Sequence, residues 1–152
     1  MLYLVDTNVL LRFVDRSHSL HSLIRIAVRT LRQEGHQLRV TAQNCIEFWN
    51  VATRPLERNG FGLAPSETER LLQLLERLFT VVPDSSEVYK EWRRLVLILG
   101  VSGVQVHDAR LVASMRVNGI SHILTLNVED FQRYISEGIK AVAPIEVGGA
   151  TN

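Results

Sequence analysis

Several residue types that characterise other classes of protein are scarce in this chain of 152 residues. A single cysteine, Cys45, excludes an intrachain disulfide. Only four prolines and nine glycines occur, and without a low-complexity tract or a repeat the chain is not of a fibrous or disordered type. No apolar run approaches the roughly 20 residues of a membrane span, and no secretion signal is recognisable. We therefore expect a soluble, cytoplasmic protein with no membrane contact.

Lysine is also scarce, because only Lys90 and Lys140 occur among the 17 basic residues and the other 15 are arginines. The formal net charge is +1. A guanidinium fork binds phosphate better than an ammonium group does, so this bias favours a nucleic-acid partner if the arginines cluster on one face. Codon bias is the alternative explanation, and clustering is not visible in a sequence.

What is present is an apolar fraction of 46%, which is ample for the core of one domain. Short β-branched or apolar runs alternate with segments of helical periodicity, a pattern that predicts a parallel sheet covered on both faces. We predict a three-layer α/β/α domain over residues 1–147 with four to five parallel strands, followed by a disordered tail over 148–152. The strands are expected at residues 2–5, 38–41, 80–82, 122–125 and 141–145. Proline in the last of them indicates a sheet edge.

The helix after residue 41 is predicted to have an apolar stripe with Glu47 beside it. The stripe comprises Ala42, Cys45, Ile46, Trp49 and Ala52. Further along, Pro65 and Ser66 with Glu69 form an expected capping box that opens a leucine-rich helix. Its leucines lie on more than one face, at positions 71, 72, 74, 75 and 78. A helix that is apolar on several sides is either deeply buried or paired with a partner, and we predict a homodimer.

Polar side chains that suit metal chemistry follow several of the predicted strands. Asp6 ends the first strand, Glu47 lies on the helix after the second, Asp108 lies in the first turn of a helix near 106–117, and Asn127 follows the strand at 122–125. In a right-handed α/β layer these positions converge at one end of the sheet. Each could instead be an ordinary helix cap or first-turn residue, and we expect the helix dipole to hold Asp108 ionised.

Close carboxylates repel one another by roughly 3 kcal/mol per pair at an effective dielectric constant near 20, so a fold that gathers them suits a cation. Oxygen ligands without a cysteine and histidine cluster select Mg²⁺ or Mn²⁺. Such ions polarise phosphate and activate water for in-line attack on a phosphodiester bond. The predicted cluster therefore favours a phosphodiester hydrolase.

Four segments of the chain resemble the signature blocks of PIN-domain ribonucleases. They are Asp6-Thr7-Asn8, Glu47, the stretch from His107 to Ala113, and the stretch from Thr125 to Phe131. Four blocks in order at suitable spacing are fairly specific. The resemblance covers roughly residues 2–146, and the small size is most similar to the VapC toxins of bacterial type II toxin-antitoxin pairs.

The resemblance implies a Mg²⁺- or Mn²⁺-dependent endoribonuclease that acts on RNA and has a cognate antitoxin protein as partner. Asp6, Glu47 and Asp108 would be the metal ligands, and Asn127 would join them as a catalytic residue. Asn127 stands where many members have aspartate, so the resemblance leaves open whether one or two metals bind. The residues expected to orient ligands or to contact substrate are Thr7, Asn8, Asp130 and Arg54.

Other functions remain open at this stage. A catalytically weak or inactive PIN-like RNA-binding module would have the same fold, and so would an RNA-processing nuclease that is not a toxin. A phosphoacceptor receiver also clusters carboxylates at strand ends, but it needs a lysine just after the last strand. Lys140 precedes that strand and no lysine follows it, which argues against a receiver.

Overall fold

The computed structural model describes residues 1–148, which form a central parallel sheet with helices on both faces. The strand order is β3-β2-β1-β4-β5, and each neighbouring pair is parallel. The strands are β1 Leu2–Val5, β2 Gln37–Thr41, β3 Thr80–Val82, β4 His122–Leu124 and β5 Lys140–Val142. The three-layer α/β/α prediction is thus confirmed, with β5 at an edge as expected.

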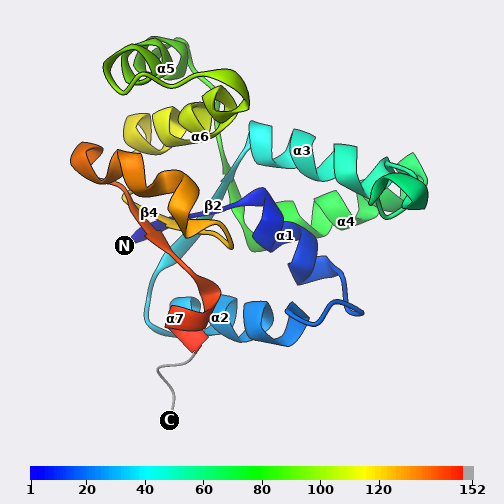
Figure 1. The fold of residues 1–152 in the computed structure, drawn as a ribbon. Coiled ribbons are helices and arrows are strands. Elements are labelled where there is room, and N and C mark those ends of the chain that lie inside the picture. The colour runs from blue at the N-terminus through cyan, green and yellow to red at the C-terminus, as the bar shows by residue number, and fades with distance from the viewer. Residues whose placement is uncertain (149–152) are drawn as a thin grey trace.

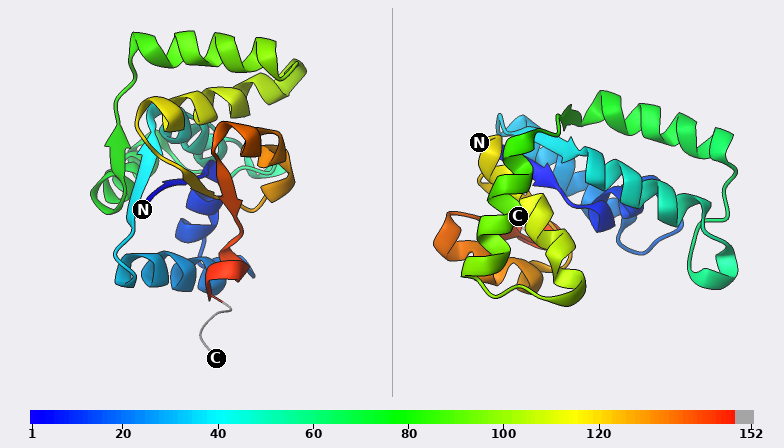
Figure 2. Two further views of the ribbon diagram at one scale, coloured as in Figure 1. Left: turned by 90° about the vertical axis from the view of Figure 1, so that its left-hand side faces the viewer. Right: turned by 90° about the horizontal axis from the view of Figure 1, so that it is seen from above.

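Helices connect the strands and form the two outer layers (Figures 1 and 2). The helices are α1 Thr7–Val14, α2 His21–Gln33, α3 Ala42–Thr53, α4 Pro65–Leu78, α5 Ser86–Ile98, α6 Val106–Val117 and α7 Pro144–Gly148. Three 3₁₀ segments accompany them: η1 Leu56–Arg58, η2 Gly103–Gln105 and η3 Val128–Glu137. No helix within residues 1–148 is long and apolar enough to cross a membrane.

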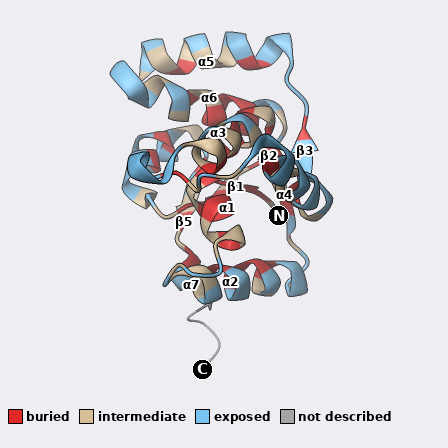
Figure 3. Cartoon of the chain, turned by 90° about the vertical axis from the view of Figure 1, so that its right-hand side faces the viewer, coloured by how far each residue is buried: buried red, intermediate tan, exposed pale blue. Residues whose placement is uncertain are grey.

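Alternation along β1 separates two apolar cores. Tyr3 and Val5 face a core that the helices α1 to α4 and α7 share, whereas Leu4 faces a second core built by α5, α6 and η3. Side chains alternate across a strand, so one four-residue strand contributes to both layers. Figure 3 shows the buried positions concentrated between the layers, while the outer surface of α5 is exposed.

The expected apolar stripe of α3 is wrong in part. Ile46 is 69% exposed, whereas Phe48 and Ala52 are fully buried. Two polar residues of this helix, Gln43 and Asn44, are also buried. Gln43 hydrogen-bonds to the His107 carbonyl and Asn44 to the Thr7 hydroxyl, both near the carboxyl ends of the strands. With these contacts made, Phe48 rather than Ile46 faces the core.

Two further boundaries differ from the predictions. Pro144 starts α7 and lies outside β5, because proline fits the first turn of a helix. Helix α4 begins after Ala64, and Glu67 rather than Glu69 accepts a hydrogen bond from the Ala64 N–H at 3.1 Å. The disordered tail expected at 148–152 lies outside the described residues except for Gly148, which ends α7.

The leucine-rich helix α4 packs most of its leucines against the body of the domain. Leu75 is fully buried, and Leu71, Leu72 and Leu78 pack partly buried against the first core. Leu74 is 42% exposed. Burial within one chain therefore accounts for most of this pattern, and the homodimer stays a prediction.

The orientation of α3 leads to a paired stability prediction. Phe48→Ala should lower the free energy of unfolding by about 3–5 kcal/mol, because it leaves a cavity in the core. Ile46→Ala should change it by less than about 0.5 kcal/mol, because Ile46 lies at the surface. Urea denaturation followed by circular dichroism measures both. Equal losses in the two variants would contradict the observed orientation of the helix.

Candidate active site at the carboxyl edge of the sheet

Asp6 is a buried carboxylate at the end of β1, with 7% of its surface exposed. It is the N-cap of α1, and its Oδ1 accepts from the Thr7 N–H at 2.8 Å. Its Oδ2 accepts from the Thr125 hydroxyl at 2.8 Å. Both donors are neutral, so hydrogen bonding satisfies part of this carboxylate without neutralising its charge.

Glu47 is connected to the first turn of α1 by hydrogen bonds. The Thr7 hydroxyl donates to Glu47 Oε2 at 2.7 Å, and Asn44 Nδ2 donates to the same hydroxyl oxygen at 3.0 Å. Asn44 is in turn held by a reciprocal capping box with Thr41 at the start of α3. The end of β2 therefore sets the position of Thr7, which orients Glu47.

Gln43 joins three elements at this edge. Its Nε2 donates to Glu47 Oε1 at 2.8 Å and to the His107 carbonyl at 2.8 Å. Its Oε1 accepts from Arg110 at 3.1 Å, and Arg110 also forms an ion pair with Asp84 at 3.2 Å. Through one amide, α3 and the first turn of α6 are held together around Glu47.

The carboxylates of Asp6 and Asp108 are affected by burial and by each other. Burial raises the pKa of Asp6 to about 6, partly offset by its hydrogen bonds and reinforced by the charges of Asp108 and Glu47. Burial, followed by the charges of Asp130 and Glu47, raises the pKa of Asp108 to about 6. The helix dipole was expected to hold Asp108 ionised. Desolvation and like charges outweigh the dipole, so the pKa is raised rather than lowered, and the carboxylate is mostly ionised only above about pH 6.

The fourth predicted block lies beside this cluster. Thr125 Oγ1 accepts from the Asn127 N–H at 3.0 Å and from Asn8 Nδ2 at 3.4 Å. Asn127 precedes η3 as predicted, but its side chain makes no capping hydrogen bond. Asp130 is exposed within η3 and acts on Asp108 through its charge. Asn8 and Thr125 therefore tie the β4 loop to α1.

Arg54 lies apart from the carboxylates, at the far end of α3. Its guanidinium donates to the Asn59 carbonyl at 3.4 Å, while its Nε is buried without a partner among the described residues. Gly60 packs so closely that a Cβ there would collide with the Arg54 carbonyl. Arg54 thus packs against the 55–60 loop, and its role toward substrate stays a prediction.

The donor chemistry of Asp6, Glu47 and Asp108 fits a hard divalent cation. Asp6 is buried with no cation paired to it among the described ion pairs, and its charged neighbours are of like sign. As placed within residues 1–148, no three acidic, histidine or cysteine side chains are close enough together to hold one ion. Mg²⁺ usually keeps several waters and binds through one or two carboxylates plus substrate phosphates, so the residues fit this mode rather than a closed cage.

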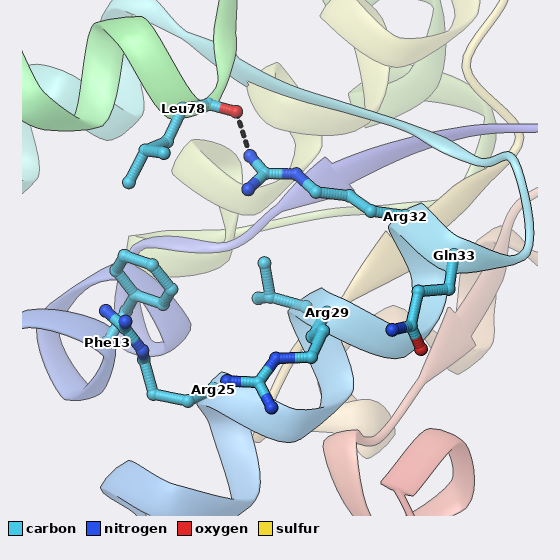
Figure 4. Close-up of a pocket in the computed structure, with 7 residues that line it drawn as sticks. Phe13, Arg25, Arg29, Arg32, Gln33 and Leu78 are labelled. Carbon is cyan, nitrogen blue, oxygen red and sulfur yellow. Dashed lines mark hydrogen bonds between the residues drawn. The ribbon is translucent and has the colours of Figure 1, made fainter.

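The arginines do cluster, but at another place. A cavity of about 360 Å³ is bordered by Arg25, Arg29 and Arg32 of α2 (Figure 4). The Arg25 guanidinium lies 4.7 Å from the centre of the Phe13 ring. Arg32 lies over a second phenylalanine ring and donates to the Leu78 carbonyl. No residue of the candidate site lines this cavity, so it does not belong to the carboxylate cluster.

Sequence reasoning missed Gln43 and the side-chain roles of Asn44 and Thr125. Gln43 lies four residues before Glu47, so helical spacing could have placed both on one face. Thr125 was visible as a hydroxyl at a strand end, but its partner Asp6 is 119 positions away. Only the strand order brings those two residues together.

Comparison with known proteins gives one family and several similar folds. A profile of the PIN domain matches residues 3–135. VapBC-1 from nontypeable Haemophilus influenzae is 17% identical, with 95% of this chain and 98% of that chain covered at a TM-score of 0.69. DNA-bound VapBC from Salmonella typhimurium is also 17% identical. The match covers 95% of this chain and 99% of that chain, with a TM-score of 0.67. VapC20 of Mycobacterium tuberculosis, described as a toxin that cleaves the sarcin-ricin loop, is 15% identical. The match covers 91% of this chain and 97% of that chain, with a TM-score of 0.60. No curated protein matches the chain.

The raised pKa of Asp108 leads to a prediction about stability without metal. From an ordinary 3.8 the pKa rises to about 6, so the folded protein binds more protons in this range and loses stability as the pH rises through it. In EDTA above pH 6, Asp108→Asn should therefore be more stable than wild type by about 1 kcal/mol. The difference should disappear as the pH falls toward 3.8. Thermal melts across this range test it, and a variant less stable than wild type at high pH would show that Asp108 is an ordinary helix-terminal residue.

Proposed function

Because this chain belongs to the PIN-domain family, we propose that it is a Mg²⁺- or Mn²⁺-dependent endoribonuclease that hydrolyses phosphodiester bonds in RNA. The main support is the buried Asp6 carboxylate, which lies beside Glu47 and Asp108 and has only neutral hydrogen-bond donors. A charge that is desolvated and close to like charges is costly unless a cation offsets it. The carboxyl edge of a parallel sheet is also where open α/β folds bind ligands.

In this proposal Asp6 and Asp108 bind the cation, and Glu47 contributes a third negative charge. When bound, the cation supplies positive charge that polarises the phosphate and acidifies water. Thr125 holds Asp6, and Thr7 and Gln43 hold the two oxygens of Glu47, so the carboxylates are oriented before substrate arrives. Both oxygens of Glu47 accept hydrogen bonds, as both oxygens of Asp6 do, so neutral donors orient both carboxylates.

The proposed setting is that of a toxin with a cognate antitoxin, in the cytoplasm. The support is the fold, which is similar to chains from VapBC complexes of several bacteria. These chains are 17% identical or less to this one, so the support for an antitoxin partner is an analogy between folds. The exposed Asn127 favours a competing function, a PIN-like RNA-binding module without activity, because it replaces a carboxylate.

Substitution of the acidic residues should abolish cleavage. Asp6→Asn and Asp108→Asn should each lose nearly all Mg²⁺-dependent RNA hydrolysis, because each removes a charged oxygen that binds the ion. Asn127→Ala should lose less, and Ile46→Ala is the surface control. Cleavage of a fluorescent RNA by purified protein is the measurement. Wild-type turnover in either aspartate variant would refute the assignment, and an inactive wild type with Mg²⁺ and with Mn²⁺ would favour the inactive binding module.

A homodimer is proposed as the assembly. Apolar side chains are exposed around the end of α5, where Leu97 is 82%, Ile98 59% and Val104 84% exposed. Burying such a patch against a second copy removes apolar surface from water. Light scattering should give twice the mass of the chain, with dissociation on dilution. A monomer mass at every concentration would reject the dimer.

A further inference from the structure

A second cavity of about 370 Å³ lies beside the candidate active site, between the start of α5 and the start of α6. Its walls include two aromatic rings, Tyr89 and Trp92, and its polar lining includes Ser85, His107 and Arg110. Helix α5 follows β3, so its first turns lie at the carboxyl edge of the sheet, the edge where Asp6 lies.

The tyrosine side of the aromatic wall is open to ligand, whereas Trp92 is half-buried against the second core. Tyr89 is 61% exposed, and its ring and that of Trp92 are nearly parallel, at 24° with centres 6.0 Å apart. The indole is held in place because Trp92 Nε1 donates to the Val106 carbonyl at 2.8 Å. The Arg93 guanidinium lies 5.9 Å from the centre of the Tyr89 ring. Exposed aromatic faces next to arginine are the usual platform on which single-stranded nucleic acids stack their bases.

This wall is connected to Glu47 of the candidate site through the side chain of Gln43. Arg110 lines the cavity and donates to Gln43, which itself donates to Glu47 and to the carbonyl of His107. A nucleotide in the cavity would thus lie next to the network that orients Glu47. In the arginine-lined cavity the guanidinium groups lie closer to the aromatic rings, at 4.7 Å from the centre of Phe13 and 5.2 Å from the centre of Phe79.

We propose that this cavity binds one unpaired base of the RNA substrate, stacked on Tyr89 and Trp92. The inference rests on the proposed ribonuclease function and deepens it, because it assigns a binding position to one base of the substrate. A base in an A-form helix is stacked within the duplex, so only a loop, a bulge or a single strand presents a free base face. The Ser85 hydroxyl makes no capping hydrogen bond to α5 and can bond a base edge. Arg110 supplies positive charge toward the neighbouring phosphate.

The test measures binding separately from cleavage. Labelled single-stranded RNA homopolymers of about eight nucleotides, and a duplex formed from two of them, are titrated in EDTA, with fluorescence anisotropy and tryptophan emission as readouts. Wild type should bind at least one single strand more tightly than the duplex, with quenching of Trp92 that Trp92→Phe removes. Tyr89→Ala should weaken binding by about 5- to 150-fold, the usual effect of losing one stacked base. Tyr89→Phe should stay close to wild type, because it keeps the ring.

Ile145→Ala is the matched control, because Ile145 is 65% exposed on α7 and lies outside this cavity. The inference is overturned if Tyr89→Ala binds single strands as wild type does, if no homopolymer quenches Trp92, or if the duplex binds as tightly. A change in oligomeric mass with unchanged RNA binding would instead assign Tyr89 to a protein interface. EDTA prevents metal-dependent cleavage, so this assay measures binding alone. Binding of a base on Tyr89 can therefore be confirmed even if the protein cleaves no RNA, and cleavage can be confirmed even if Tyr89→Ala does not weaken binding.

Discussion

The Asp6 carboxylate is removed from water, and the hydrogen bonds and charges around it determine how far this burial is offset. The charge lies at the end of a central strand, where β1 leaves the sheet and α1 begins. Neutral donors from Thr7 and Thr125 satisfy its oxygens without cancelling its charge. Like charges on Asp108 and Glu47 add to the cost. A bound cation would stabilise this arrangement.

The fold places these side chains by topology, and a local hydrogen-bond network refines their positions. Strands β1 and β4 are neighbours in the sheet, which brings Thr125 to Asp6. The capping box at the start of α3 sets Asn44, and Asn44 sets the hydroxyl of Thr7. Gln43 then connects α3 to α6. These contacts preorganise the acidic residues, as sites that must bind an ion at a defined place require.

The sequence predicted the parts of this arrangement that depend on local pattern. The β1 strand and the position of Asp108 in the first turn of α6 follow from local periodicity and helix-start residues. The edge position of β5 was predicted correctly but from Pro144, which lies outside that strand. Predictions from local pattern were wrong at residues whose burial or pKa is set by contacts with other elements. Ile46 is apolar yet exposed, because buried polar contacts of α3 turn Phe48 inward instead. The pKa of Asp108 is raised rather than lowered, because burial and, after it, negative charges on other elements outweigh the helix dipole.

Metal binding by the acidic cluster is the central claim, and a Mn²⁺ titration followed by electron paramagnetic resonance tests it most directly. The account predicts saturable binding at pH 7.5 in wild type and loss of most of it in Asp6→Asn. It also predicts weaker binding as the pH falls below 6, because protons then compete for the two aspartates whose pKa values are raised to about 6. Equal binding by wild type and Asp6→Asn, or no binding by either, would contradict the account.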